Sequence, residues 1–258
     1  MSLLRIEAVS VTFGGLAALR QVGLTINEGE IVGLIGPNGA GKTTLFNSVS
    51  GFQPIDDGAV YFEGTALSKL PPYKVAAMGI SRTFQASRIF NRMTVLEHIL
   101  VGADKRLKAG LWGAIFRPRW VIHEEQQAKE RGLKILELFE DRLLPRLDHF
   151  AETLSYANRR RMEIARALVS EPKLLLLDEP TAGMNPHESA GIIDLIKKIR
   201  ELGITVFLIE HDMKVIMGVS DRIVVLDHGE KIAEGHPQEI RHNEEVIQAY
   251  LGRRHGHA

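Results

Sequence analysis

One segment restricts the possible folds of this 258-residue chain more than any other. Residues 36–43 match the pattern G-x-x-x-x-G-K-[ST], after an apolar run at 31–35 that predicts a strand and before a predicted helix at 41–49. Glycines in such a loop let successive backbone N–H groups surround phosphate oxygens, and the new helix directs its positive end at them. The lysine can reach the β- and γ-phosphates, and the threonine hydroxyl can bind Mg²⁺. The nucleotide-binding residues predicted from this segment are Gly36, Pro37, Asn38, Gly39, Ala40, Gly41, Lys42, Thr43 and Thr44.

A second, acidic motif fits the first. Four leucines at 174–177 predict a fully buried strand, and Asp178 and Glu179 follow where that strand ends. Open α/β sheets bind ligands at the carboxyl ends of their strands. We therefore expect Asp178 to hold Mg²⁺ together with Thr43, and Glu179 to polarise the attacking water. An acidic pair that only caps a surface strand is the alternative.

The composition is that of an ordinary globular protein, with 45% hydrophobic and 25% charged residues. Lys+Arg and Asp+Glu both total 32, and this zero net charge argues against a general nucleic-acid binder. Cysteine is absent, which excludes disulfides and thiol catalysis and fits a reducing compartment. No apolar run is long enough for a membrane span, and the N-terminus resembles a strand rather than a signal peptide. We expect a chain that is soluble when isolated.

The C-terminal half predicts a parallel sheet. Apolar runs at 204–209 and 222–226 alternate with predicted helices at 187–202 and 213–219, which is typical of βαβ units whose sheet is covered on both faces. The fold class is therefore α/β.

Residues 102–150 differ from the rest, because they contain a long predicted helix at 123–140 and no predicted strand. Another helix begins near Ser155. We expect one domain over 1–258, in which 1–85 and 170–235 form a β-subdomain and an α/β core, 86–169 an inserted helical subdomain, and 236–258 a helical tail.

The base of the nucleotide is predicted to be adenine. The chain has no Asn-Lys-x-Asp run of the kind that recognises guanine. Phe13, after the first predicted strand, offers an aromatic face for stacking, and a position in the core is the alternative for it.

Taken together, these segments resemble the ATP-binding subunits of ABC transporters. The matching segments are Phe13, 36–43, Arg82-Thr83-Phe84-Gln85, Leu154-Ser155-Tyr156-Ala157-Asn158, 174–179 and Ile209-Glu210-His211-Asp212. The resemblance covers essentially the whole chain. It implies a P-loop NTPase of the ABC type, with a RecA-like core, an N-terminal antiparallel β-subdomain and an inserted helical subdomain. It also implies ATP and Mg²⁺ as cofactors.

The resemblance adds further site residues. Gln85 matches the Q-loop glutamine, which contacts Mg²⁺ or water near the transmembrane partner, and His211 matches the switch histidine at the γ-phosphate. An ordinary polar loop residue and a structural histidine are the alternatives. The implied catalytic residues are Glu179, His211 and Gln85, and the implied Mg²⁺ ligands are Thr43, Gln85 and Asp178.

The signature segment departs from the general family pattern Leu-Ser-Gly-Gly-Gln. Ser155 is kept, but Tyr156, Ala157 and Asn158 replace both glycines and the glutamine. The resemblance implies that this segment presents Ser155 and a helix N-terminus to ATP held by another subunit. Ala157 adds a Cβ where glycine allows close approach of the backbone. We expect at least two of the three arginines at 159–161 to face solvent.

Within the family, the chain resembles the larger ATPase of branched-chain amino acid importers. Residues 82–90, Tyr156 and the ending at 235–252 carry this resemblance. It implies a homo- or heterodimer of cassettes at the cytoplasmic face of the inner membrane, with permease subunits as partners, a substrate-binding protein as an indirect partner and no nucleic acid. The alternatives are a cassette for lipopolysaccharide or lipid export, one for urea or amide import, and a soluble ABC ATPase outside transport.

Overall fold

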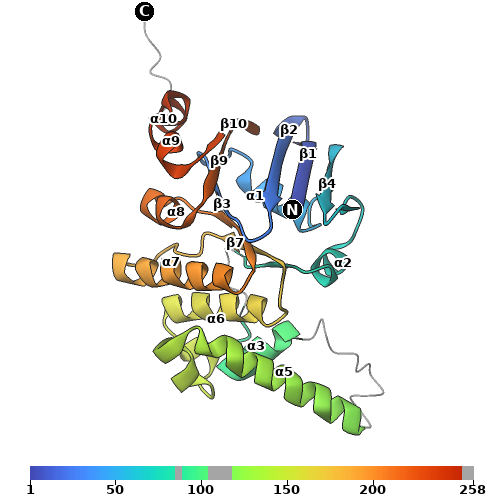
Figure 1. The fold of residues 1–258 in the computed structure, drawn as a ribbon, viewed down its shortest axis with the longest axis vertical. Helices are drawn as coiled ribbons and strands as arrows, with labels where there is room; N and C mark the ends of the chain where they lie inside the picture. The colour runs from blue at the N-terminus through green and yellow to red at the C-terminus, as the bar shows by residue number, and fades with distance from the viewer. Residues whose placement is uncertain (85–88, 104–117, 252–258) are drawn as a thin grey trace, which may run out of the picture.

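Two β-sheets stand above layers of helices in the computed structural model, which describes residues 1–84, 89–103 and 118–251 (Figure 1). The first sheet is antiparallel, in the order β2-β1-β4-β5. The second has the order β10-β9-β3-β8-β7-β6, and it is parallel except for the edge strand β10. The strands are β1 (Ser2–Phe13), β2 (Leu16–Asn27), β3 (Ile31–Ile35), β4 (Asp57–Phe62), β5 (Thr65–Ala66), β6 (Ile80–Arg82), β7 (Leu174–Asp178), β8 (Thr205–Ile209), β9 (Arg222–Asp227) and β10 (Glu230–Gly235).

Helices α3 and α5 to α10 surround the sheets, and α1 and α2 lie beside the strands (Figure 1). In the view of Figure 1, α7 runs beneath the strands, α6, α3 and α5 lie below it, and α8 to α10 lie to the left. The helices are α1 (Lys42–Val49), α2 (Pro72–Ala77), α3 (Val95–Ala103), α5 (Arg119–Glu137), α6 (Tyr156–Leu168), α7 (Pro186–Glu201), α8 (Met213–Val219), α9 (Pro237–Arg241) and α10 (Glu244–Leu251), with 3₁₀ turns η2 (Glu140–Arg142), η3 (Leu144–Arg146) and η4 (Ala151–Thr153).

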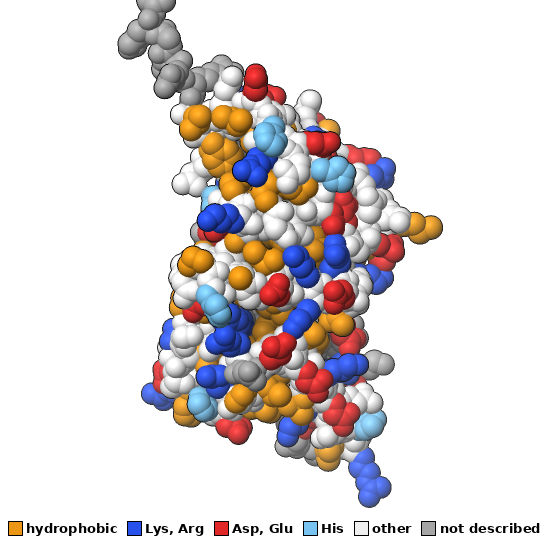
Figure 2. Space-filling view, turned by 60° about the vertical axis from the view of Figure 1, so that its left-hand side comes forward, with side chains coloured by type: hydrophobic (Ala, Val, Ile, Leu, Met, Phe, Trp, Pro, Cys, Tyr) orange, Lys and Arg blue, Asp and Glu red, His pale blue; other side chains and the backbone are white. Residues whose placement is uncertain are grey.

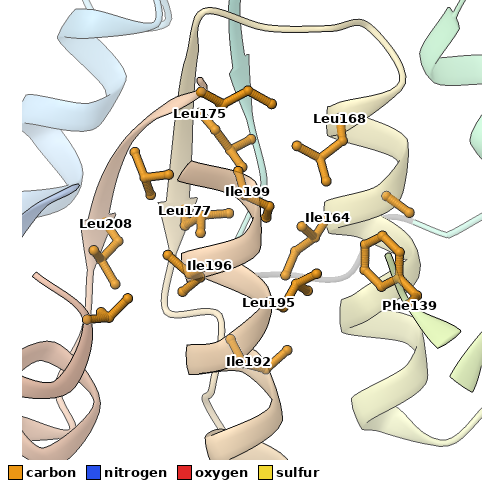
Figure 3. Packing of buried hydrophobic residues seen from close by; sticks show 14 of the residues in the cluster. Phe139, Ile164, Leu168, Leu175, Leu177, Ile192, Leu195, Ile196, Ile199 and Leu208 are labelled. Carbon is orange, nitrogen blue, oxygen red and sulfur yellow. The ribbon is translucent and has the colours of Figure 1, made fainter. Parts of the chain in front are cut away.

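The central strands are apolar throughout because both faces of their sheet are covered. Every residue of β3, β7 and β8 is buried, and successive side chains enter two different cores. Leu174 and Leu176 join the core beneath the antiparallel sheet, whereas Leu175 and Leu177 join the core formed with α6 and α7. Figure 3 shows the second core, where β7 and β8 face Ile192, Leu195, Ile196 and Ile199 of α7 and Ile164 and Leu168 of α6.

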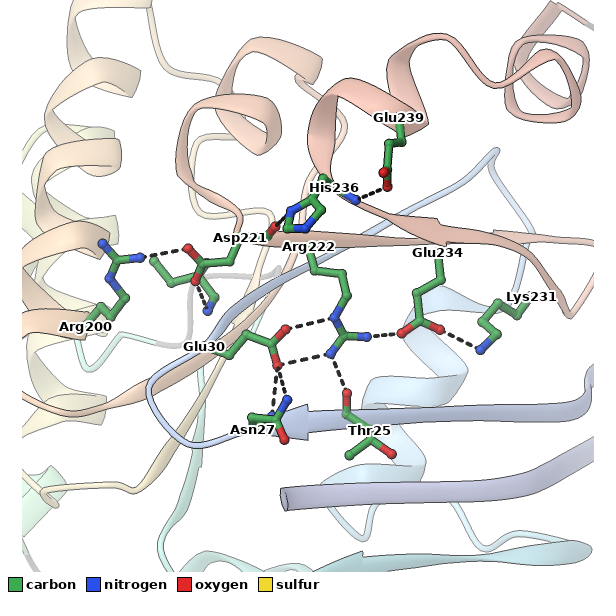
Figure 4. A network of polar contacts seen from close by, with 11 residues as sticks. Thr25, Asn27, Glu30, Arg200, Asp221, Arg222, Lys231, Glu234, His236 and Glu239 are labelled. Carbon is green, nitrogen blue, oxygen red and sulfur yellow. Dashed lines mark hydrogen bonds and ion pairs between the residues drawn. The ribbon is translucent and has the colours of Figure 1, made fainter. Parts of the chain in front are cut away.

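A polar network connects the strands at the end of the parallel sheet where β3 and β9 begin (Figure 4). Arg222, at the start of β9, donates to both carboxylate oxygens of Glu30, at 2.8 and 3.0 Å, and also to Thr25 O and Glu234. Burial opposes ionisation of Glu30, but the hydrogen bonds from Arg222 hold its pKa below the ordinary value. This network lies where β3 and β9 begin, so it stabilises the sheet without entering the site at the opposite strand ends.

The predicted α/β architecture is confirmed, with local differences. The helix predicted at 123–140 is α5, which begins at Arg119 and ends at Glu137. The tail is helical, as predicted, and consists of two helices, because the Asn243 side chain accepts hydrogen bonds from the N–H groups of Glu245 and Val246 and so starts α10 separately. In the part of the chain that the structure describes, no helix is long and apolar enough to cross a membrane. The proposed subdivision into core, helical insertion and tail stays a prediction.

Candidate active site

The glycine-rich loop lies at the carboxyl end of β3 and leads into α1, as predicted. Gly36 requires glycine, because a Cβ there would lie 2.0 Å from the carbonyl oxygen of Leu226. Lys42 is buried, and its amine donates to Gly36 O at 2.7 Å and to Pro37 O at 2.8 Å. Burial lowers the pKa of Lys42, although the charges of Glu179 and Asp178 act in the opposite direction. The lysine at the end of the loop is therefore hydrogen-bonded to the carbonyls at its start.

The predicted nucleotide-binding residues differ in how open they are. Gly36, Ala40 and Lys42 are buried, Pro37, Gly41 and Thr44 are half-buried, and Asn38, Gly39 and Thr43 are exposed. Phe13 is 49% exposed at the end of β1, so the alternative of a core position is wrong for it. Its stacking on adenine stays a prediction.

Glu179 and His211 meet directly at the ends of neighbouring strands. The parallel register pairs Asp178 of β7 with Ile209 of β8, and the Glu179 N–H donates to Ile209 O at 3.0 Å. The Glu179 carboxylate lies 2.7 Å from His211 Nε2, and Glu179 has a left-handed φ of 48°. Such backbone strain in a non-glycine residue is concentrated at functional sites. The two residues that the sequence separates by 32 positions thus form one contact pair.

Asp178 has a partner that the sequence analysis missed. Its Oδ2 lies 3.0 Å from the guanidinium of Arg82, and both side chains are buried. Arg82 also donates to the Asn47 side chain at 2.6 Å and to the Ser50 hydroxyl at 3.0 Å, so it ties β7 to α1. Arg82 was quoted only as part of the family pattern, and no local signal indicated this ion pair.

The oxygen donors fit the predicted Mg²⁺ ion. Within the described residues, no hydrogen bond reaches Asp178 Oδ1, and Thr43 is exposed where α1 begins. No group of three Asp, Glu, His or Cys residues in the described ranges could hold a metal alone. Mg²⁺ commonly takes one or two protein oxygens and completes its shell with phosphate and water. Gln85, the third predicted ligand, lies outside the described residues, so its roles stay predictions.

Glu210 is a second buried residue of the site whose partners were not predicted from the sequence. Its carboxylate is buried and accepts hydrogen bonds from the Thr181 N–H and hydroxyl, at 2.9 and 2.6 Å, and from the His211 N–H, at 3.1 Å. One side chain thus fixes the loops that follow β7 and β8. Its position at a strand end, before His211, was the available signal.

The prediction for the arginines at 159–161 is wrong. Arg160 and Arg161 are only 3% and 7% exposed. Arg160 donates to Phe84 O at 2.6 Å, to Glu163 at 3.0 Å and to Glu179 O at 3.4 Å. It is buried because its face of α6 packs toward the parallel sheet, where carbonyls and a carboxylate replace water. The helix therefore contacts the backbone of the predicted water-polarising residue.

The signature segment forms the start of α6. Ser155 is the N-cap and accepts a hydrogen bond from Asn158 N–H at 3.4 Å. Ser155 and Tyr156 are exposed, Asn158 is half-buried and accepts a hydrogen bond from Arg161 at 3.2 Å, and Ala157 is buried. The extra methyl group of Ala157 is therefore covered by protein. The predicted contact with ATP on another subunit stays a prediction.

Comparison with known proteins decides the family. Residues 19–182 match the family model described as ABC transporter. The chain belongs to this family. Residues 230–256 of the ABC protein also match the model described as branched-chain amino acid ATP-binding cassette transporter. The predicted ABC-type P-loop fold and the predicted ATPase activity are thereby confirmed.

Named relatives match this ABC ATPase over nearly its whole length. It is 44% identical over 251 residues to the high-affinity branched-chain amino acid transport ATP-binding protein LivG of Salmonella typhimurium, covering 97% of this chain and 98% of the relative. BraF of Pseudomonas aeruginosa, which has the same description, is 42% identical with the same coverage.

Solved cassettes share the fold. The ADP conformation of MJ1267, an ATP-binding cassette of an ABC transporter, has a TM-score of 0.85 at 34% identity and covers 98% of this chain and 99% of that one. The dimeric post-hydrolysis state of the cassette MJ0796, bound to ADP and Pi, has a TM-score of 0.74 at 28% identity, with 91% of this chain and 99% of that one covered.

Proposed function

We propose that this ABC ATPase drives a membrane importer of branched-chain amino acids, with Glu179 and His211 at the centre of hydrolysis. The observation that carries the catalytic part is the 2.7 Å contact between these two side chains, beside the phosphate loop. The relatives that span the same length, LivG and BraF, support the cargo.

The chain's own groups account for each requirement of hydrolysis. The loop N–H groups and Lys42 hold the phosphates, and the amine exchanges Gly36 O and Pro37 O for phosphate oxygens. The Glu179 carboxylate orients the attacking water and accepts its proton, while His211 keeps that carboxylate in place. Thr43 and Asp178 would hold Mg²⁺, which would supply neutralisation of the phosphate charge.

A second cassette completes the site. Ser155 and Tyr156 are exposed at the start of α6, where a helix N-terminus favours a phosphate from another subunit. The solved relative MJ0796 is dimeric in its post-hydrolysis state. The partner is either a second copy of this chain or a different cassette.

The permease is proposed to bind a groove lined by the segment that precedes Gln85 in the sequence. This groove of about 350 Å³ is lined by Phe52, Tyr73, Phe84, Val101 and Arg166, among others. Phe52 and Tyr73 are exposed, and Phe52 packs edge-on against Phe84 with ring centroids 5.5 Å apart. Exposed aromatic side chains in a concave surface suit a protein partner. Binding there places the cassette at the cytoplasmic face of the inner membrane.

Purification from membranes tests both the partner and the cargo. Tagged wild-type chain is expected to retain a permease, a second cassette and a substrate-binding protein, and the Tyr73→Ala variant is expected to retain less permease. Vesicles that contain the purified complex are then expected to accumulate leucine or isoleucine in an ATP-dependent manner, and the Glu179→Gln complex is not. Accumulation of urea, or movement of lipid instead, would reject the proposed cargo but not the ATPase.

A further inference from the structure

The C-terminal helix α10 reaches the phosphate loop through one tyrosine. Tyr250, the next-to-last residue of α10, accepts a 2.8 Å hydrogen bond at its hydroxyl from the Gly36 N–H. The two residues are 214 positions apart in the sequence. Gly36 opens the loop that binds phosphate, and nothing in the function described so far gives the tail a role.

Three contacts fix the backbone at Gly36. Tyr250 accepts from its N–H, and the Lys42 amine donates to its carbonyl at 2.7 Å. On its third side the carbonyl of Leu226 approaches so closely that a Cβ would lie 2.0 Å away. The hydroxyl therefore orients the peptide that precedes the Gly36 Cα, and the amine orients the peptide that follows it. Because Gly36 cannot move toward Leu226, the two contacts together set its φ and ψ. The orientation of Gly36 in turn sets where Lys42 rests before nucleotide enters.

The tail is anchored well enough to act on the loop. Ile240 of α9 and Val246 of α10 are buried in the core that contains α6 and α7. Met213 and Met217 of α8 line the same apolar cavity of about 540 Å³ as Tyr250. Figure 2 shows hydrophobic side chains gathered over this end of the molecule. Tyr250 of α10 therefore contacts the loop after β3 and lines one cavity with α8, the helix that begins two residues after His211.

The tyrosine is suited to accept a hydrogen bond. Burial raises the pKa of Tyr250, although the hydrogen bond from Gly36 opposes this, so the hydroxyl stays neutral near pH 7. Its ring is only partly covered, so removing the hydroxyl leaves the packing of α10 intact.

We propose that Tyr250 is a positioning residue for nucleotide binding, which holds the Gly36 backbone in the conformation that phosphate binding requires. The inference rests on nucleotide binding at the loop and not on the cargo. Tyr250 lies within residues 230–256, which match the branched-chain amino acid cassette model. The residue proposed for this role is therefore in the C-terminal segment and not in residues 19–182, which match the general ABC transporter model.

Tyr250→Phe tests the inference, because it removes one oxygen atom and keeps the ring. Loss of an acceptor for a partly buried N–H is expected to raise the Kd for a fluorescent ADP analogue about three- to tenfold. The KM for ATP is expected to rise by a similar factor while kcat stays within about twofold, since uniform binding is lost. Tyr61→Phe, on β4 with its ring under Arg5, is the matched control and is expected to change neither constant.

A second variant separates positioning from simple stabilisation. Val246→Ala loosens the anchor of α10 without touching the hydroxyl, so it is expected to weaken ADP binding. If both residues act through the same contact, the double variant with Tyr250→Phe is expected to have a Kd for ADP no higher than the higher Kd of the two single variants. Additive losses would overturn the coupling. A folded Tyr250→Phe protein that binds ADP within twofold of wild type would overturn the inference, whether or not its melting temperature falls.

Lys42→Ala distinguishes this failure from failure of the proposed function. If Lys42→Ala loses nucleotide binding and Tyr250→Phe does not, only the role of the tail is rejected. If both variants bind ADP like wild type, the assignment of the phosphate loop is rejected as well, and the role of the tail falls with it.

Discussion

Replacing Arg160 tests how the helical layer is joined to the hydrolytic site. Its guanidinium bonds Phe84 O, the Glu163 carboxylate and Glu179 O from within α6, and both charged side chains are buried. One residue thus connects the signature helix with the segment leading to Gln85 and with the backbone of Glu179. We predict that the ion pair with Glu163 mainly affects the free energy of unfolding, and that the contacts with the two carbonyls mainly affect the turnover of ATP.

The expected magnitudes follow from the burial of the pair. Arg160→Met alone leaves the Glu163 carboxylate buried without this partner, which is expected to lower the free energy of unfolding by about 3–5 kcal/mol. Replacing both residues, in Arg160→Met/Glu163→Met, removes the buried charges together and is expected to restore stability to within about 1 kcal/mol of wild type, because apolar replacement of a buried pair is often neutral. The double variant still lacks the donors to Phe84 O and Glu179 O. We expect its turnover to fall about tenfold, which corresponds to about 1.4 kcal/mol of activation free energy.

Urea unfolding and steady-state ATP hydrolysis at saturating Mg-ATP measure the two effects. The single variant should unfold at lower urea concentration than wild type, and the double variant should unfold near wild type but hydrolyse ATP slowly. A double variant that is stable and also hydrolyses ATP at the wild-type rate would refute the reasoning, because the two carbonyl contacts would then have no part in turnover.

Three further predictions concern single residues. Glu179→Gln is expected to bind ATP normally, to lower turnover at least about a hundredfold and to accumulate an ATP-bound dimer in gel filtration; wild-type turnover would reject the role of Glu179. Gly36→Ala is expected to lower the melting temperature and weaken ATP binding, because its Cβ meets the Leu226 carbonyl, and an unchanged melting curve would show that the backbone can yield. Burial, with a smaller contribution from Arg166, lowers the pKa of His98 to about 4. Between about pH 6.5 and pH 4, His98 therefore binds a proton in the unfolded chain but not in the folded one. The free energy of unfolding is expected to keep the whole contribution of His98 above about pH 6.5 and to fall by up to about 3 kcal/mol as the pH drops toward 4. The His98→Asn variant should lack this part of the slope in urea unfolding.

The core of the candidate site follows from rules that act over a few residues. A strand, a glycine-rich loop and a helix start can be recognised locally, and β3, the loop and α1 occupy the predicted positions. Asp178 and Glu179 were predicted at a strand end, and the parallel register of β7 and β8 brings them beside His211. His211 itself was identified only through the family resemblance, because one histidine after a strand carries no specific signal.

The errors share a physical origin. The arginines at 159–161 were expected in water because charged side chains usually are, but the fold supplies Arg160 with the carbonyls of Phe84 and Glu179, and Glu163 of the same helix is a third acceptor. Arg82 and Glu210 were missed for the same reason, since their partners come from other strands and loops. The tail was predicted as helical without a division, because the periodicity of its apolar residues does not reveal that Asn243 starts a second helix.

The sequence by itself determined the class of this protein, because hydrophobic period, glycine positions and strand-end acids are properties of short segments. Four consecutive leucines at 174–177 already predicted a fully buried strand, and residues 36–43 already predicted a phosphate loop. Only the tertiary structure decided which polar groups pair across the chain: Arg82 with Asp178, Arg160 with Glu179 O, and Tyr250 with Gly36. A buried donor or acceptor needs a partner, but any segment that the fold brings within about 3 Å can provide it, and local sequence carries no record of that choice.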